Sequence, residues 1–201
     1  MNIEDTVFCS VDIETTGLDP ERDEILAVAC IPIRCLKISV SSAYYTLVHP
    51  RKYCIDSMKY HGISPGDLET APTFKEIAEQ VLTAMDGILV GYSVDFDYVF
   101  LRRHFRHVGL KLKRDLLDIA AIERWIREQQ ASRDRDFSLE GIMASYGLRQ
   151  CYRHHATADA FFAAQIFQMQ VLKLLRLGVH TTRKLIRIAR CRWDDGSTFA
   201  F

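Results

Sequence analysis

The chain has 201 residues, with 26 basic and 26 acidic side chains, so its formal net charge is zero, and 48% of its residues are hydrophobic. These values are ordinary for a soluble globular protein and suit one compact domain over 1–201 with a sizeable core. No apolar run approaches the roughly 20 residues of a membrane span, and the acidic N-terminus is unlike a signal peptide. Six scattered cysteines without a C-x-x-C pair argue against a zinc ribbon or disulfide framework, so we expect a cytoplasmic protein.

Hydrophobic periodicity predicts three strands, followed by helices that alternate with further strands. The first strand begins at Val7 and ends at Thr15-Thr16-Gly17, and the next two cover 24–33 and 39–48 as an antiparallel meander. A short strand is predicted over 88–93. Helices are predicted over 74–85, 95–108, 115–129 (with a very short strand at its start), 138–146, 156–177 and 181–189. This order predicts an α/β fold with a mixed sheet, a meander plus parallel strands, flanked by helices.

Charge is segregated along the chain. Residues 4–24 are mainly acidic, whereas 102–114 and 173–192 are mainly basic, and a basic C-terminal extension covers about 178–201. An acidic region flanked by basic surfaces suits a metal-dependent enzyme that acts on a polyanion. Ordinary solvated helix faces would give the same charge runs.

The first strand carries two carboxylates on one face. Side chains alternate along a strand, so Asp12 and Glu14 lie on the same side, roughly 6.6 Å apart along the backbone. Unpaired buried acids cost several kcal/mol, so these groups need a proton or a cation. A divalent metal ion would satisfy both carboxylates at once.

Two more acids begin the apolar faces of helices. Asp97 and Asp159 each lie in a predicted first turn, where the helix dipole alone would explain either one. Four acids that converge on one pocket repel each other unless cations lie between them. Two divalent ions about 3.5–4 Å apart are the usual solution in phosphoryl chemistry. Hard oxygen ligands favour Mg²⁺ or Mn²⁺ over zinc.

His154 precedes the helix that carries Asp159, and we expect it in the loop before that helix. A histidine with a pKa near neutrality can take a proton from an attacking water. On composition alone, a surface histidine beside Arg153 is the simpler interpretation.

Three segments resemble a known family. Residues 12–17 (D-I-E-T-T-G) resemble the first motif of the DnaQ-like 3′–5′ exonucleases, and 96–101 resemble the second. Residues 154–159 (H-H-A-T-A-D) match the third in the H-x-A-x-x-D form of the DEDDh branch. Order and spacing are similar to those of the proofreading epsilon subunits of bacterial DNA polymerase III, over roughly residues 6–170.

The resemblance implies a ribonuclease H-like fold in which Asp12, Glu14, Asp97 and Asp159 hold two Mg²⁺ or Mn²⁺ ions, with His154 as the general base. It implies hydrolysis of single-stranded DNA from its 3′ end, with release of nucleoside 5′-monophosphates. Candidate substrate contacts are Thr15, Thr16, Gly17, His61 and Phe100. For Phe100 a core position is the simpler interpretation, and for His61 an ordinary loop histidine.

Several alternatives stay open at this point. The family often has His-Asn where this chain has Tyr92-Ser93, which puts substrate preference in doubt. An exoribonuclease that trims RNA 3′ ends shares the same residues, and a non-catalytic module that binds nucleic acid or a polymerase would keep the fold without the chemistry. Association with a polymerase, the oligomeric state and the role of the basic C-terminal helix are not decided by the sequence.

Overall fold

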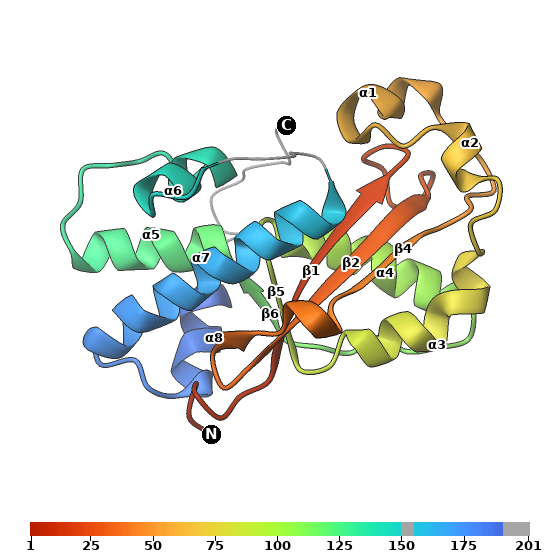
Figure 1. Cartoon of the computed structure of the whole chain (residues 1–201). Coiled ribbons are helices and arrows are strands. Elements are labelled where there is room, and N and C mark those ends of the chain that lie inside the picture. The colour runs from red at the N-terminus through yellow and green to blue at the C-terminus, as the bar shows by residue number, and fades with distance from the viewer. Residues whose placement is uncertain (150–154, 191–201) are drawn as a thin grey trace.

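The computed structural model describes residues 1–149 and 155–190, which form a six-stranded mixed sheet with helices on both faces (Figure 1). The strand order is β3-β2-β1-β5-β6, and β4 also pairs with β2. β1 is antiparallel to β2 and parallel to β5, while β5 is parallel to β6. The strands are β1 (Phe8–Thr15), β2 (Ile25–Arg34), β3 (Lys37–Ile38), β4 (Tyr44–Leu47), β5 (Ile88–Gly91) and β6 (Leu116–Asp118). The predicted mixed sheet is confirmed.

The third predicted strand, 39–48, is wrong in its extent. A 3₁₀ turn at Val40–Ser42 takes its first half, and β4 begins at Tyr44. The serines of this segment favour turns because their hydroxyls compete for backbone hydrogen bonds. β4 does not reach the C-terminal end of β2. That end pairs with β3 instead, which follows a tight turn with positive φ at Cys35 and Leu36. Both short strands are antiparallel to β2.

Five of the six predicted helices begin within one residue of their predicted starts, and two further short α-helices lie between β4 and the first of them. Their bounds are α1 (Met58–His61), α2 (Pro65–Leu68), α3 (Phe74–Ala84), α4 (Val94–His107), α5 (Ile119–Gln129), α6 (Leu139–Ser145), α7 (Ala156–Arg176) and α8 (Thr182–Arg190). At the start of α3, the Glu76 carboxylate accepts hydrogen bonds of 2.8 Å from both the backbone N–H and the hydroxyl of Thr73. The helix predicted from residue 115 begins later, after β6, because the Asp118 side chain caps it.

The two faces of the sheet have separate cores. Phe8 of β1 packs on the α7 side, edge-on to Phe167 with ring centroids 4.9 Å apart. Cys9, Val11 and Ile13 pack on the other side, in the cluster that includes residues of α3 and α4. The alternation predicted for the first strand is therefore confirmed. It directs Asp12 and Glu14 toward the face that α7 covers.

The basic helix α8 packs into the core that α5 and α7 share. Leu185, Ile188 and Ala189 are buried there, while Lys184 and Arg187 are exposed. The described part of the predicted 178–201 extension thus covers the sheet, and 191–201 lie outside the described residues. Within the described ranges, none of the helices has the length and apolar character that crossing a membrane requires.

Candidate active site

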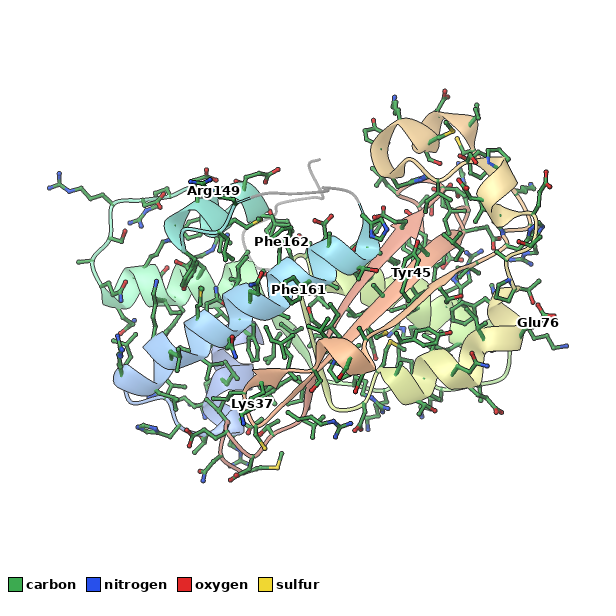
Figure 2. The ribbon with its side chains drawn as sticks, viewed as in Figure 1. Lys37, Tyr45, Glu76, Arg149, Phe161 and Phe162 are labelled. Atoms are coloured by element: carbon green, nitrogen blue, oxygen red, sulfur yellow. The ribbon has the colours of Figure 1, made fainter. Side chains whose placement is uncertain are left out.

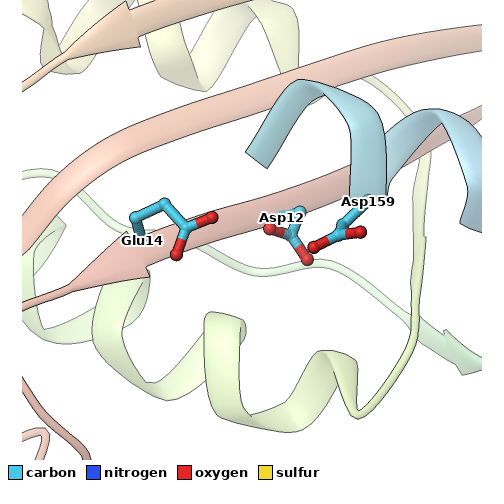
Figure 3. Close-up of side chains that lie close together, drawn as sticks. All are labelled: Asp12, Glu14 and Asp159. Atoms are coloured by element: carbon cyan, nitrogen blue, oxygen red, sulfur yellow. The ribbon is translucent and has the colours of Figure 1, made fainter. Parts of the chain in front are cut away.

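Three carboxylates from distant parts of the chain meet at the end of β1. One oxygen each of Asp12, Glu14 and Asp159 can be chosen so that all three lie within 4.8 Å of one another (Figure 3). Asp12 and Glu14 come from the α7 side of β1, and Asp159 comes from the first turn of α7. Three of the four predicted acids therefore form one cluster.

Small residues and one hydrogen bond bring α7 close to the sheet at this point. Ala27 and Ala29 of β2 pack against Ala156 and Ala160 of α7, and all four are buried. The Ser10 hydroxyl donates a 2.8 Å hydrogen bond to the carbonyl of Ala160. Because Ser10 lies two residues before Asp12, and Ala160 directly follows Asp159, this contact holds the two acidic segments together.

Asp97 reaches the same strand end from the other face of the sheet. Its Oδ1 accepts a 2.9 Å hydrogen bond from the backbone N–H of Ile13, the residue between Asp12 and Glu14. Burial raises the pKa of Asp97 well above its usual range, and the charges of Glu14 and Asp118 raise it further. Asp97 thus lies at the predicted edge, bound to the backbone, and is not part of the three-oxygen cluster.

The pKa of Glu14 shows the electrostatic effect of this clustering. Burial, followed by the negative charge of Asp159, raises the pKa of Glu14 from 4.5 to about 8. At neutral pH the cluster therefore favours a bound proton or a cation. A single Mg²⁺ holds opposite oxygen ligands about 4.2 Å apart, close to the span of these oxygens. The donor set fits a divalent metal ion that prefers oxygen.

A fifth acid, which was not predicted from the sequence, lies near this edge. Asp118 ends β6, is buried, and accepts hydrogen bonds from the backbone N–H groups of Ala120 and Ala121. Burial is the main cause that raises its pKa to about 6, and the charge of Asp95 adds to it. Its position directly after an apolar strand was the available sequence signal. Its described contacts cap α5.

The turn that follows Glu14 has a fixed backbone. The Thr16 hydroxyl donates to the Asp23 carboxylate at 3.1 Å and accepts from the N–H of Glu24 at 3.0 Å. The Thr15 hydroxyl donates to the carbonyl of Gly17 at 2.7 Å. A Cβ on Gly17 would lie 2.5 Å from the Asp23 carboxylate, so a larger residue there would displace that carboxylate from its contact with Thr16. These three predicted substrate residues are held by contacts within the turn.

Arg103 of α4 fastens this turn to the helix. Its guanidinium donates to the carbonyl of Asp23 at 3.2 Å and to the carbonyl of Glu21 at 2.6 Å. Asp23 in turn accepts from Thr16, so the contacts of Arg103 reach the segment directly after Glu14. The role of Arg103 was not predicted from the sequence, because it depends on the packing of α4 against the turn.

The remaining predicted residues are His61, Phe100 and His154. His61 is buried in α1, where Nε2 lies 3.0 Å from the Ser57 hydroxyl and Nδ1 accepts from the N–H of Ile63. Phe100 has no exposed surface and packs against Phe96 in the core beside α4, so a contact with substrate would require movement of that core. His154 lies outside the described residues. The substrate and base roles of these residues stay predictions.

Comparisons of the sequence with known proteins identify relatives of the chain. A family model described as exonuclease, of the RNase T type, matches residues 9–167. A PolC-type DNA polymerase III of Thermotoga maritima is 32% identical over 87% of the chain, which spans 12% of that protein. The DNA polymerase III subunit epsilon of Aquifex aeolicus is 27% identical over 83% of the chain and is covered over 81% of its length. The 3′-5′ exonuclease DinG of Staphylococcus aureus is 23% identical over 91% of the chain, which spans 20% of DinG.

A solved structure has the same fold. E. coli exonuclease I in complex with a dT13 oligonucleotide superposes with a TM-score of 0.74, over 86% of this chain and 42% of that one, at 17% identity. The similarity extends to the mixed sheet and its flanking helices. Together with the family match over most of the chain, it agrees with the ribonuclease H-like fold that the motifs implied. The chain belongs to the exonuclease family, in which relatives such as DinG are named 3′–5′ exonucleases.

Proposed function

We propose that the chain is a metal-dependent exonuclease that shortens single-stranded DNA from its 3′ end and releases nucleoside 5′-monophosphates. The observation that carries this proposal is the group of three carboxylates, drawn from β1 and α7, at the end of a core strand. Membership of the exonuclease family supports the reaction class. The name of the DinG relative supports the 3′–5′ direction.

In this proposal Asp12, Glu14 and Asp159 hold two Mg²⁺ or Mn²⁺ ions, and Asp97 completes the ligand set. When bound, the ions would lower the pKa of a water molecule and stabilise negative charge on the leaving 3′-oxygen. His154 takes the proton from the attacking water, and the turn directly after Glu14 contacts the terminal nucleotide. Its hydrogen bonds to Asp23 keep that turn in one conformation for this contact.

The names of two relatives support DNA as the substrate, because both refer to DNA polymerase III. The solved exonuclease I carries a dT13 oligonucleotide, which also favours DNA. A polymerase partner belongs to the same proposal, as does a location in the cytoplasm. An exoribonuclease would use the same carboxylates, so the two substrates have to be separated by experiment.

The test uses one single-stranded sequence made as DNA and as RNA, labelled at the 5′ end or the 3′ end. With Mg²⁺ or Mn²⁺, we expect the 3′ label to leave first as a mononucleotide and the 5′ label to give a descending ladder. DNA should be degraded faster than RNA, and Asp12→Asn should degrade neither.

Each other result has a clear meaning. Faster degradation of RNA would favour the exoribonuclease. Binding without degradation would favour the non-catalytic module. Normal turnover by Asp12→Asn would contradict the carboxylate assignment.

A further inference from the structure

Two exposed aromatic rings lie beside the acidic cluster. Tyr45 of β4 stacks on His155, the N-cap residue of α7, with ring centroids 5.3 Å apart and planes inclined by 23°. Tyr45 is 41% exposed, and His155 is also exposed. Figure 2 shows Tyr45 near the first turns of α7. An edge strand and a helix start together present an aromatic surface to solvent.

The sheet fixes Tyr45 relative to Asp12. Tyr45 pairs with Ala29 across β4 and β2, and Ala29 pairs with Asp12 across β2 and β1. Residues directly opposite each other point to the same face, so these three form one row on the α7 side. Neighbouring strands are about 4.8 Å apart, which places the backbone of Tyr45 about 10 Å from that of Asp12.

The helix fixes His155 relative to Asp159. The backbone N–H of Asp159 donates a 3.1 Å hydrogen bond to the carbonyl of His155, one turn earlier. Each ring is therefore tied to one of the clustered acids, through a strand row or through a helical turn. Burial raises the pKa of Tyr45, and the charges of Glu14 and Asp67 raise it further, which keeps the phenol neutral beside the acids.

We propose that Tyr45 and His155 form a stacking platform for one base of the single-stranded substrate, near the bond that is cut. This inference rests on the proposed exonuclease function and adds substrate contacts at Tyr45, which lies outside the three motifs, and at His155, which holds an unspecified position of the third. Single-stranded nucleic acids bind proteins through aromatic side chains on which successive bases stack, because every base has a π-face. The backbone of Tyr45 lies about 10 Å from that of Asp12, so the platform would be near the proposed metal site.

The test measures binding of single-stranded DNA by fluorescence anisotropy in an Asp12→Asn background with Mg²⁺. One oligonucleotide is intact, and the others carry one abasic site at each of the last four positions of the 3′ end. With Tyr45 present, we expect an abasic site at one position to weaken binding about 10-fold, within the range of base–aromatic stacking. Tyr45→Leu should weaken binding of the intact oligonucleotide by a similar factor and remove the sensitivity to that abasic site. Tyr45→Phe should keep both.

Tyr44 supplies a matched control on the same strand. It points to the opposite face of the sheet, toward α3, where its hydroxyl lies 3.5 Å from Oε1 of Gln80. Tyr44→Leu should leave both the affinity and the abasic effect unchanged. Melting temperatures of all variants check that the fold is intact.

The outcomes separate this inference from the proposal on which it rests. If Tyr45→Leu weakens intact and abasic oligonucleotides equally, the ring acts by holding α7, and the platform is wrong. The same holds if no abasic position affects binding. If the protein with Asp12 intact neither binds nor shortens DNA, the exonuclease proposal fails and the platform fails with it. Degradation of DNA together with an unaltered abasic effect in Tyr45→Leu would overturn the platform alone.

Discussion

Two polar clusters lie along α7, one with three carboxylates and one built around the single carboxylate of Glu123, and their negative charge is balanced in different ways. Asp159 marks the first cluster, and Gln170 marks the second, about 16 Å further along the helix. In the second, the Glu123 carboxylate accepts hydrogen bonds from Arg127 at 2.9 Å, from the Tyr146 hydroxyl at 2.7 Å and from the Gln170 amide at 3.1 Å. The chain supplies this cluster with its own cation and donors.

In the first cluster, the described neighbour whose charge shifts the pKa of Glu14 is another carboxylate, that of Asp159. The pKa of Glu14 rises to about 8 because of burial and the charge of Asp159. An acid balanced by an internal arginine indicates a structural ion pair. Neighbouring carboxylates that raise each other's pKa are typical of a site that binds a cation. Substitutions in each cluster separately test this difference.

The largest effect is expected at the first cluster. Asp159→Asn removes a ligand charge while it keeps the side-chain volume, and turnover of a 3′-labelled oligonucleotide should fall by about 10³-fold or more, equivalent to about 4 kcal/mol. In metal-free buffer the melting temperature should hold or rise, since one repulsive charge is gone. A large loss of metal-free stability would show that Asp159 is structural.

The opposite signature is expected at the second cluster. Arg127→Met leaves Glu123 buried without its cation, which should lower the free energy of unfolding by about 3–5 kcal/mol. Urea denaturation measures this loss, and turnover per folded molecule should stay near normal. Adding Glu123→Gln to Arg127→Met should restore much of the stability. No stability loss in the single variant would remove the distinction between the clusters.

Some of this architecture follows from the sequence alone. The period of two along a strand fixes Asp12 and Glu14 on one face, and the capping box at Thr73 fixes the start of α3. Both features depend only on neighbouring residues, which is why the sequence predicts them, and the structure confirms both. The third strand failed for a local reason, because its serines favour a turn over a ladder.

Other features depend on which distant segments meet. The bond of Asp97 to the N–H of Ile13 joins residues 84 positions apart, and the stack of Tyr45 on His155 joins β4 to α7. Hydrophobic periodicity carries no information on such pairs. The burial of Glu123 could not be predicted from the sequence either, because an acid within a helical pattern is usually exposed. Its arginine, tyrosine and glutamine partners are known only from the fold.

The pH dependence of stability sharpens the distinction further. Between about pH 4.5 and 8, the folded chain keeps a proton on Glu14 that the unfolded chain has released, so metal-free stability should fall as pH rises through this range. The raised pKa values of Asp97 and Asp118 act in the same direction. Thermal melting in EDTA should show this slope, and Glu14→Gln should flatten it. Added Mg²⁺ should stabilise the protein more at pH 8 than at pH 5, and a slope of opposite sign would contradict the cluster.

The smallest effect concerns Arg103, a cation close to the first cluster that is engaged with the main chain. Its guanidinium binds the carbonyls of Glu21 and Asp23 and lies 3.9 Å from the Glu21 carboxylate, so its expected role is to hold the turn after Glu14 rather than to balance the charge of the three clustered acids. Arg103→Met should raise KM for single-stranded DNA a few-fold, equivalent to about 1 kcal/mol, with kcat nearly unchanged. Stabilisation by Mg²⁺ should stay as in the parent protein. A strong change in that stabilisation would mean that Arg103 takes part in the charge balance, and the first cluster would then resemble the second.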